Sequence, residues 1–248
     1  GPETIAAFIA EPITGASGVI VPPEGYYQKV QAVLNRYGIM FWADEVITGF
    51  GRTGNDFGCT TMAIESPDMM TFAKQLSSAY MPISASAIRR EMYDAMIEQS
   101  ASAGAFGHGY TYSGHPVACA VALKTLEIYQ RDKIFEKAAE SGAYLQKRLA
   151  EFADHPLVGE VRGSGLIGAL ELVANKETGE PFVGGAVGGY AQKMAQDNGL
   201  LIRTVAGSCL GFCPPLIITN EQIDEMIEKV APALDATLDH CKKENLLR

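Results

Sequence analysis

Five consecutive apolar residues, Ile39 to Ala43, stand between a glycine and a pair of acidic residues. A short run without alternating polar residues is typical of a parallel strand that is covered on both faces. The residues before it predict a helix that Pro22-Pro23-Glu24 opens and Gly38 ends. A further apolar run, Thr4 to Ala10, precedes that helix. The order strand, helix, strand therefore predicts an α/β fold with a mainly parallel sheet.

Two more apolar runs, Met69 to Ala73 and Ile83 to Ile88, extend the predicted sheet as strands of the same kind. From Pro116 the pattern changes to long amphipathic helices with a few short strands, which predicts a smaller α+β domain. We therefore expect two domains, residues 1–129 and residues 130–248. In the later part of the chain the expected helices span 117–129, 134–152, 187–198 and 221–240, and β-like segments span 161–173 and 200–204.

Charge and composition argue against several classes of function. The 20 Lys and Arg stand against 29 Asp and Glu, a net charge of −9, so we expect no nucleic-acid partner. No apolar run reaches the ~18 residues of a membrane span, and no basic-then-apolar leader begins the sequence, so we expect no membrane association. The five cysteines lie far apart without C-x-x-C spacing. This favours reduced thiols in a cytoplasmic protein over a disulfide framework or a metal site.

Two predicted strands end in residues that can carry chemistry. Asp44 and Glu45 follow the strand 39–43, and Lys74 follows the strand 69–73. Ligands of open α/β sheets bind beyond the carboxyl ends of the strands, so these side chains face the expected crevice. Burial at a strand edge would desolvate Lys74 and favour the neutral amine, the nucleophile that Schiff-base chemistry needs. The alternatives are a helix cap or surface ion pair for the acids and a lysine at the sheet rim that extends into solvent.

Two glycine-rich segments are candidate ligand-binding loops. Residues 49–54 fit the dinucleotide pattern G-x-G-x-x-G, but they lie five residues beyond the strand and open no helix, so we interpret them as an active-site loop. Residues 107–114 form a polar loop before Pro116, and its hydroxyls and N–H groups suit an anion such as phosphate. His108 and His115 lack a third ligand nearby and make a weak metal case, so we expect no metal.

Four motifs occur in order along the chain: EPITGASG at 11–18, ADEVITGFGRTG at 43–54, TFAK at 71–74 and GYTYSGHP at 109–116. Together they resemble the class III (omega) aminotransferases, enzymes that use pyridoxal 5′-phosphate (PLP), and among these the amine–pyruvate branch. The later stretches VRGSGL at 161–166 and CPPLI at 213–217 resemble the C-terminal domain of the same family. The resemblance implies a fold-type I PLP-transferase: an incomplete large domain with a mainly parallel sheet, followed by a small C-terminal domain.

The resemblance also implies roles for single residues. Lys74 matches the lysine that forms the Schiff base and shuttles a proton, and Asp44 matches the carboxylate that pairs with the pyridine nitrogen. Val46 matches the residue that packs on one face of the ring. Thr111 matches the hydroxyl that reaches the cofactor phosphate of the other subunit, which implies a homodimer or larger assembly with shared active sites.

Two positions bear on the substrate. Ala16 stands where ornithine and 4-aminobutyrate relatives carry a glutamate that pairs with a C-terminal arginine. The absence of this glutamate points to amine or small amino-acid donors and pyruvate-like acceptors. The position expected for the arginine holds Thr204, and a one-residue insertion, such as Ala206, would bring Arg203 into place. Arg203 would then grip a substrate carboxylate bidentately.

The expected reaction moves an amino group from an amine or ω-amino acid to a keto acid, with pyruvate as the expected acceptor. Because the sequence starts in mid-pattern, we expect the C-terminal part of the family's chain, with only part of the cofactor site. The first alternative is a class III racemase, aminomutase or decarboxylase, because these relatives also carry a lysine and an aspartate at the positions of Lys74 and Asp44. An inactive partial chain is the other alternative, and a nucleotide-dependent oxidoreductase is a distant third.

Overall fold

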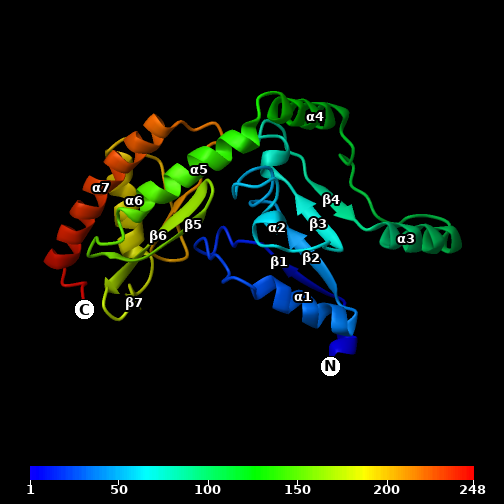
Figure 1. The fold of residues 1–248 in the computed structure, drawn as a ribbon, viewed down its shortest axis with the longest axis horizontal. Coiled ribbons are helices and arrows are strands. Elements are labelled where there is room, and N and C mark those ends of the chain that lie inside the picture. Colours follow the sequence, from blue (N-terminus) through cyan, green and yellow to red (C-terminus); the bar gives the residue numbers. More distant parts are fainter. The chain divides into compact units, whose positions relative to one another are not determined.

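The computed structural model describes all residues from 1 to 248, and they form two compact units (Figure 1). The first unit comprises Gly1–Pro12, Pro22–Phe50 and Phe57–Lys133, and the second comprises Ile13–Val21, Gly51–Asp56 and Ile134–Arg248. Two short early segments thus belong with the C-terminal half of the chain, an arrangement that the sequence did not suggest. That residues 1–129 and 130–248 fold as independent domains stays a prediction.

A four-stranded sheet forms the centre of the first unit. Its strands are β1 (Ala7–Ala10), β2 (Met40–Asp44), β3 (Met69–Phe72) and β4 (Ala85–Ile88), in the order β1-β2-β3-β4. The helical elements of this unit are η1 (Pro2–Thr4), α1 (Tyr26–Tyr37), α2 (Gly58–Thr61), η2 (Lys74–Leu76), α3 (Arg90–Ala103) and α4 (Pro116–Arg131). β1, β2 and β3 run parallel, as expected.

The prediction that 83–88 forms another parallel strand is wrong. β4 pairs antiparallel with β3, with Thr71 opposite Ser86, and its residues are largely exposed. The connection from β3 to β4 contains only the short η2, whereas a parallel pairing usually needs a helix that carries the chain back across the sheet. The chain therefore turns back along the edge of the sheet.

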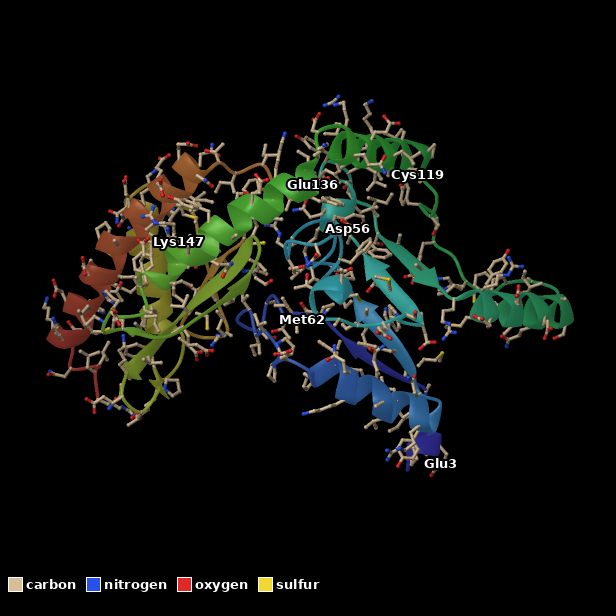
Figure 2. All side chains as sticks on the ribbon, in the orientation of Figure 1. Glu3, Asp56, Met62, Cys119, Glu136 and Lys147 are labelled. Carbon is tan, nitrogen blue, oxygen red and sulfur yellow. The ribbon has the colours of Figure 1, made fainter.

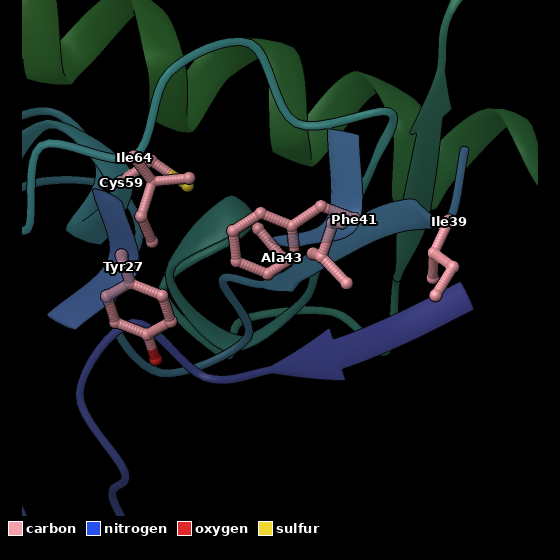
Figure 3. Close-up of a cluster of buried hydrophobic side chains, with 7 residues drawn as sticks. Tyr27, Ile39, Phe41, Ala43, Cys59 and Ile64 are labelled. Atoms are coloured by element: carbon pink, nitrogen blue, oxygen red, sulfur yellow. The ribbon is translucent and has the colours of Figure 1, made fainter. Parts of the chain in front are cut away.

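The core of the first unit lies on one face of β2. Buried side chains from α1, β2 and the region of α2 pack together there (Figure 3): Tyr27, Leu34, Ile39, Phe41, Ala43, Cys59 and Ile64. Along β2 buried and half-buried residues alternate, and Trp42 and Asp44 lie on the less covered face. β2 is therefore covered fully on one face only, which corrects the expectation drawn from its apolar run.

The helices of the first unit follow their capping residues. α1 begins at Tyr26 rather than at Pro22, because Gly25 adopts a left-handed φ of 77° at its N-cap. It ends before Gly38, as predicted, where φ is 64°. α3 was not predicted, although Met92, Tyr93, Met96 and Ile97 recur along it at helical spacing. None of its residues is buried within the unit.

The second unit combines helices with an antiparallel sheet. The helices are α5 (Ile134–Ala150), α6 (Ala186–Asp197) and α7 (Asn220–Lys243). The strands are β5 (Val158–Ser164), β6 (Ile167–Asn175), β7 (Glu180–Pro181), β8 (Arg203–Val205) and β9 (Cys209–Phe212). The sheet has the order β5-β6-β9-β8, and β7 pairs with β6. On α5, Leu145 and Leu149 are fully buried, whereas Lys147 is exposed (Figure 2).

The β-like segment 161–173 is a hairpin rather than one strand. β5 and β6 pair antiparallel, and Gly165 turns the chain between them with a φ of 56°. A Cβ at Gly165 would lie 2.4 Å from the Thr53 carbonyl carbon, so both the backbone conformation and the space require glycine. No helix of either unit is both long and apolar enough to cross a membrane.

Candidate active site

Asp44 is the last residue of β2, and its side chain is half-buried. It lies opposite Thr71 of β3, and the next N–H, that of Glu45, donates to the Thr71 carbonyl at 3.0 Å. The Val46 N–H donates to Asp44 Oδ1 at 3.0 Å and so fixes the carboxylate. No group of the chain donates to Oδ2. That oxygen is therefore able to accept a hydrogen bond from a ligand.

Glu45 is a buried carboxylate, 1% exposed, with a role that the sequence left open. It accepts hydrogen bonds from Thr48 Oγ1 at 2.5 Å, from the Gly58 N–H at 2.9 Å and from the Cys59 N–H at 2.6 Å. Gly58 and Cys59 open α2, so Glu45 caps that helix. Burial and then the Glu45 charge raise the pKa of the Cys59 thiol. For Glu45 the helix-cap alternative is correct.

Lys74 lies two residues after the end of β3 and opens η2. Its backbone adopts a left-handed φ of 41°, uncommon for a residue with a side chain. The side chain is exposed, so the expectation of an amine desolvated by burial in this chain is wrong. The reason is that the chain turns off the sheet at this point, and the lysine lies in the turn rather than within a covered strand. Asp44 and Lys74 thus follow neighbouring parallel strands, as predicted.

The glycine-rich segment 49–54 is a buried connection rather than an open binding loop. Arg52 is only 3% exposed, and its Nη1 donates to the Leu166 carbonyl at 2.8 Å and to the Pro214 carbonyl at 2.6 Å. A Cβ at Gly51 would lie 2.7 Å from the Phe135 ring, and the φ of Gly51 is 89°. The glycine allows close packing, and the arginine holds two later loops of the second unit. The interpretation of an active-site loop is therefore corrected.

Thr111 lies in the exposed segment between α3 and α4. No hydrogen bond joins it to Asp44, Val46 or Lys74. In the same segment His115 has a local role, because its Nδ1 accepts the Ala118 N–H at 3.4 Å and caps α4. The expected anion-binding function of residues 107–114 stays a prediction.

Arg203 begins β8, opposite Gly211 of β9, and its side chain is exposed. The neighbouring Thr204 is engaged within the unit, since its Oγ1 donates to the Gly188 carbonyl at 3.0 Å. The side chain of Arg203, by contrast, has no hydrogen-bonding or ionic partner in the chain. Ala206 has a left-handed φ of 45° in the turn after β8, a conformation that is uncommon for alanine.

A cavity of about 830 Å³ lies beside Arg203 within the second unit. Its walls are largely apolar and come from the segments around β8 and β9 and from the first turns of α7, including Leu200, Phe212 and Met226. Arg203 and Lys229 add two cations to the lining. Lys229 forms an ion pair with Glu225 at 2.5 Å, so Arg203 is the unpaired cation there.

The structure therefore brings Asp44, Val46 and Lys74 to one edge of one sheet. Thr111 belongs to the same unit but forms no hydrogen bond with them, and Arg203 belongs to the other unit. The chain holds no group of three or more His, Cys, Asp or Glu that could bind a metal ion. Arg52 is the residue whose structural role sequence reasoning missed, since the glycine pattern around it indicated a loop and gave no sign of its buried hydrogen bonds.

Comparison with known families and proteins gives a consistent result. The family described as Aminotransferase class-III matches residues 1–234. The chain is 50% identical over 238 residues to a putrescine–pyruvate aminotransferase of Pseudomonas aeruginosa, covering 96% of this chain and 51% of that protein. It is 49% identical over 238 residues to gamma aminobutyrate transaminase 3, chloroplastic, of tomato (Solanum lycopersicum), covering 96% of this chain and 45% of that protein. The chain thus spans about half the length of these relatives.

Solved structures agree with the sequence comparison. An omega transaminase of Pseudomonas jessenii in complex with PMP superposes with a TM-score of 0.93 at 49% identity, covering 96% of this chain and 52% of that one. A structure described as a transaminase with L-ala gives a TM-score of 0.94 at 49% identity and covers 97% and 56% of the two chains. These matches confirm the expected fold-type I architecture. On the family match over nearly its whole length, the chain belongs to the class III aminotransferases.

Proposed function

We propose that this chain supplies the Schiff-base lysine of a PLP-dependent aminotransferase, which moves an amino group from an amine or ω-amino acid to a keto acid, with pyruvate as acceptor. The observation that carries the proposal is the pair at the sheet edge. Asp44 has one oxygen fixed by the Val46 N–H and the other open, and Lys74 follows the adjacent parallel strand. A cofactor with a pyridine ring and an aldehyde requires both groups: a carboxylate that accepts from the protonated ring nitrogen and an amine that condenses with the aldehyde.

The residues fit the cofactor chemically. When bound, PLP supplies an electron sink for the electrons released at the substrate Cα. Asp44 would hold a proton on the ring nitrogen through its open Oδ2, since a carboxylate favours the protonated form. Lys74 Nζ would take the proton from the substrate Cα and return it. Val46 would limit the position of the ring from one side, and the Thr111 hydroxyl would bind the cofactor phosphate of the other subunit.

Two residues support the proposed substrate class. Arg203 has an exposed guanidinium without a partner in the chain, so it is able to bind a carboxylate bidentately. Ala16 offers no carboxylate that could neutralise that arginine. The names of two relatives, a putrescine–pyruvate aminotransferase and a gamma aminobutyrate transaminase, agree with an amine or ω-amino acid donor.

We further propose a homodimer in the cytoplasm. The segment that carries Thr111 is exposed throughout residues 101–114, which suits a loop that reaches a second subunit. The five cysteines form no disulfide, which agrees with a reducing compartment. Analytical ultracentrifugation of the full gene product tests the assembly, and cell fractionation tests the location.

Borohydride reduction after addition of PLP tests the cofactor assignment. The full gene product that contains these residues is incubated with PLP and reduced, and its peptides are mapped by mass spectrometry. We expect a stable pyridoxyl group on Lys74 and none on Lys29, which is also exposed but lies on α1. Absence of the Lys74 adduct from the full gene product would overturn the proposal.

A product assay separates transamination from the related reactions. We expect each amine consumed with pyruvate to yield one alanine. A racemase, aminomutase or decarboxylase would consume its substrate without this stoichiometry. An adduct on Lys74 that appears only in the full gene product, and not in residues 1–248 alone, would show that this chain is an incomplete site.

The substitution Asp44→Asn tests the role of the carboxylate. Because an amide no longer favours the protonated ring, we expect kcat to fall by a factor of about 10²–10³, while Lys74 is still labelled by PLP and borohydride. Asp94→Asn on α3 is the control, since Asp94 is exposed and pairs only with Arg90. Equal kcat values for the two variants would contradict the assignment of Asp44.

A further inference from the structure

The turn that carries Lys74 is strained at several positions. Lys74, Ser78 and Ala79 all adopt left-handed backbone conformations, with φ values of 41°, 47° and 60°. None of them is glycine, so each conformation costs free energy and persists only where the surroundings hold it. The turn therefore needs bonds that fix it.

Most of these bonds are local. The Ser77 and Ala79 N–H groups donate to the Lys74 carbonyl at 3.2 and 3.1 Å. Ser77 Oγ donates to the Met81 carbonyl at 2.7 Å. Such bonds shape the turn but do not tie it to the rest of the unit. Among the hydrogen bonds of residues 73–80, only those to Tyr129 come from a distant part of the chain.

Tyr129 lies on α4, far along the chain from the turn, and is 7% exposed. Its hydroxyl donates to the Gln75 carbonyl at 2.8 Å and lies 2.7 Å from Ser78 Oγ. A phenol has one proton, so the Ser78 hydroxyl donates to the Tyr129 oxygen in turn. One buried hydroxyl thus links the residue after Lys74 to Ser78, a strained residue of the same turn.

We propose that Tyr129 is a positioning residue for Lys74: its hydroxyl clamps the strained turn to α4 and so fixes where the amine of Lys74 can reach. This inference rests on the proposed function. Tyr129 acts through the turn and not on the substrate. Without the hydroxyl, the turn loses its anchor to α4, and the amine spends less time in the reactive position.

The test compares two buried tyrosines of the first unit. Tyr129→Phe removes the clamp. Tyr27→Phe is the matched control, because Tyr27 is 2% exposed and its hydroxyl also donates to a backbone carbonyl, that of Glu11 at 2.6 Å. Circular dichroism and thermal unfolding establish that both variants fold. Amide hydrogen exchange and steady-state kinetics are then measured on the full gene product.

Without cofactor, we expect the Ser77 and Ala79 amides to exchange about 10-fold faster in Tyr129→Phe and unchanged in Tyr27→Phe. With PLP bound, we expect kcat to fall about 10-fold in Tyr129→Phe with the donor KM unchanged, and the pH dependence of the cofactor absorbance to shift. Ser78→Ala should give a smaller loss, and the double variant should lose little beyond Tyr129→Phe, since both residues belong to one network.

Equal exchange rates and equal kcat in the two tyrosine variants would overturn the proposal, since the hydroxyl would then contribute only to stability. Failure of the proposed function would give a different result, because wild-type Lys74 would then take up no pyridoxyl group. Hydrogen exchange, measured without cofactor, would in that case be the test of whether Tyr129 holds the turn. Faster exchange confined to Tyr129→Phe would still support the clamp, and equal exchange would reject it.

Discussion

Lys74 combines an exposed side chain with a backbone conformation that is unfavourable for any residue with a Cβ. The chain retains it although glycine would fit that φ without strain. Strain of this kind is common where function fixes a side chain that stability alone would not select. The amine at this position therefore costs stability.

Substitution of Lys74 measures that cost. We expect Lys74→Gly to be more stable than Lys74→Ala by about 1 kcal/mol, because the left-handed conformation penalises alanine and not glycine. Urea unfolding of the two variants without cofactor gives the difference. An alanine variant at least as stable as the glycine variant would show that the turn is not strained at this residue.

His155 is a second residue whose environment sets its chemistry. Its side chain lies in the connection from α5 to β5, where Nδ1 accepts the Leu157 N–H at 3.2 Å and Nε2 lies 3.5 Å from Asp235 Oδ1. Burial lowers the pKa of His155 below its usual 6.5, and Asp235 opposes this only in part. His155 is thus held neutral in the folded chain.

This shift predicts the pH dependence of stability. The unfolded chain protonates His155 near pH 6.5, whereas the folded chain resists protonation, so the contribution is present above pH 6.5 and is lost as the pH falls toward the folded pKa. We expect the decrease in unfolding free energy between pH 7.5 and 5.5 to be smaller in His155→Gln than in the wild type. His108→Gln, at an exposed site, is the control and should follow the wild type.

At the scale of elements, the sequence predicts what a periodic pattern or a cap marks. α4, α5, α6 and α7 lie within a few residues of their expected positions. The direction of β4 was not predictable from its own residues, because an exposed edge strand and a buried strand differ in what covers them and not in the run itself. The carboxylate and lysine at the strand ends were predictable by motif, and a helix cap was one of the alternatives for Glu45. The bonds of Arg52 and Tyr129 are long-range contacts that no local pattern marks.

The connection that holds Arg52 gives a test at this scale. Its guanidinium is buried and donates to carbonyls near β6 and after β9. We expect Arg52→Ala to lower the unfolding free energy by about 3 kcal/mol, since buried carbonyls lose a charged donor, and Arg52→Lys to recover only part of this. Arg90→Ala on the exposed face of α3 is the control, with a change within about 0.5 kcal/mol.

At the scale of the whole molecule, the second unit depends on two segments from the first quarter of the chain. Ile13 is fully buried, and Arg162 donates to the Gly18 carbonyl from Nη2 at 2.9 Å. A fragment of residues 130–248 lacks these segments and Arg52. We expect it to melt well below the full 248-residue chain, with exposed apolar surface that binds a hydrophobic dye. An equally high melting temperature for the fragment would support 130–248 as an independent domain.

Because segments of the two units alternate along the chain, folding during synthesis is delayed. The chain passes from one unit to the other after Pro12, Val21, Phe50, Asp56 and Lys133. Arg162 is synthesised 144 residues after Gly18, which at about 5–20 residues per second is a delay of about 7–29 s. During that interval the early segment emerges from the ribosome without its partner. The nascent chain therefore cannot finish one unit before the other begins, and a growing polypeptide of this kind is a natural client for chaperones that shield apolar segments.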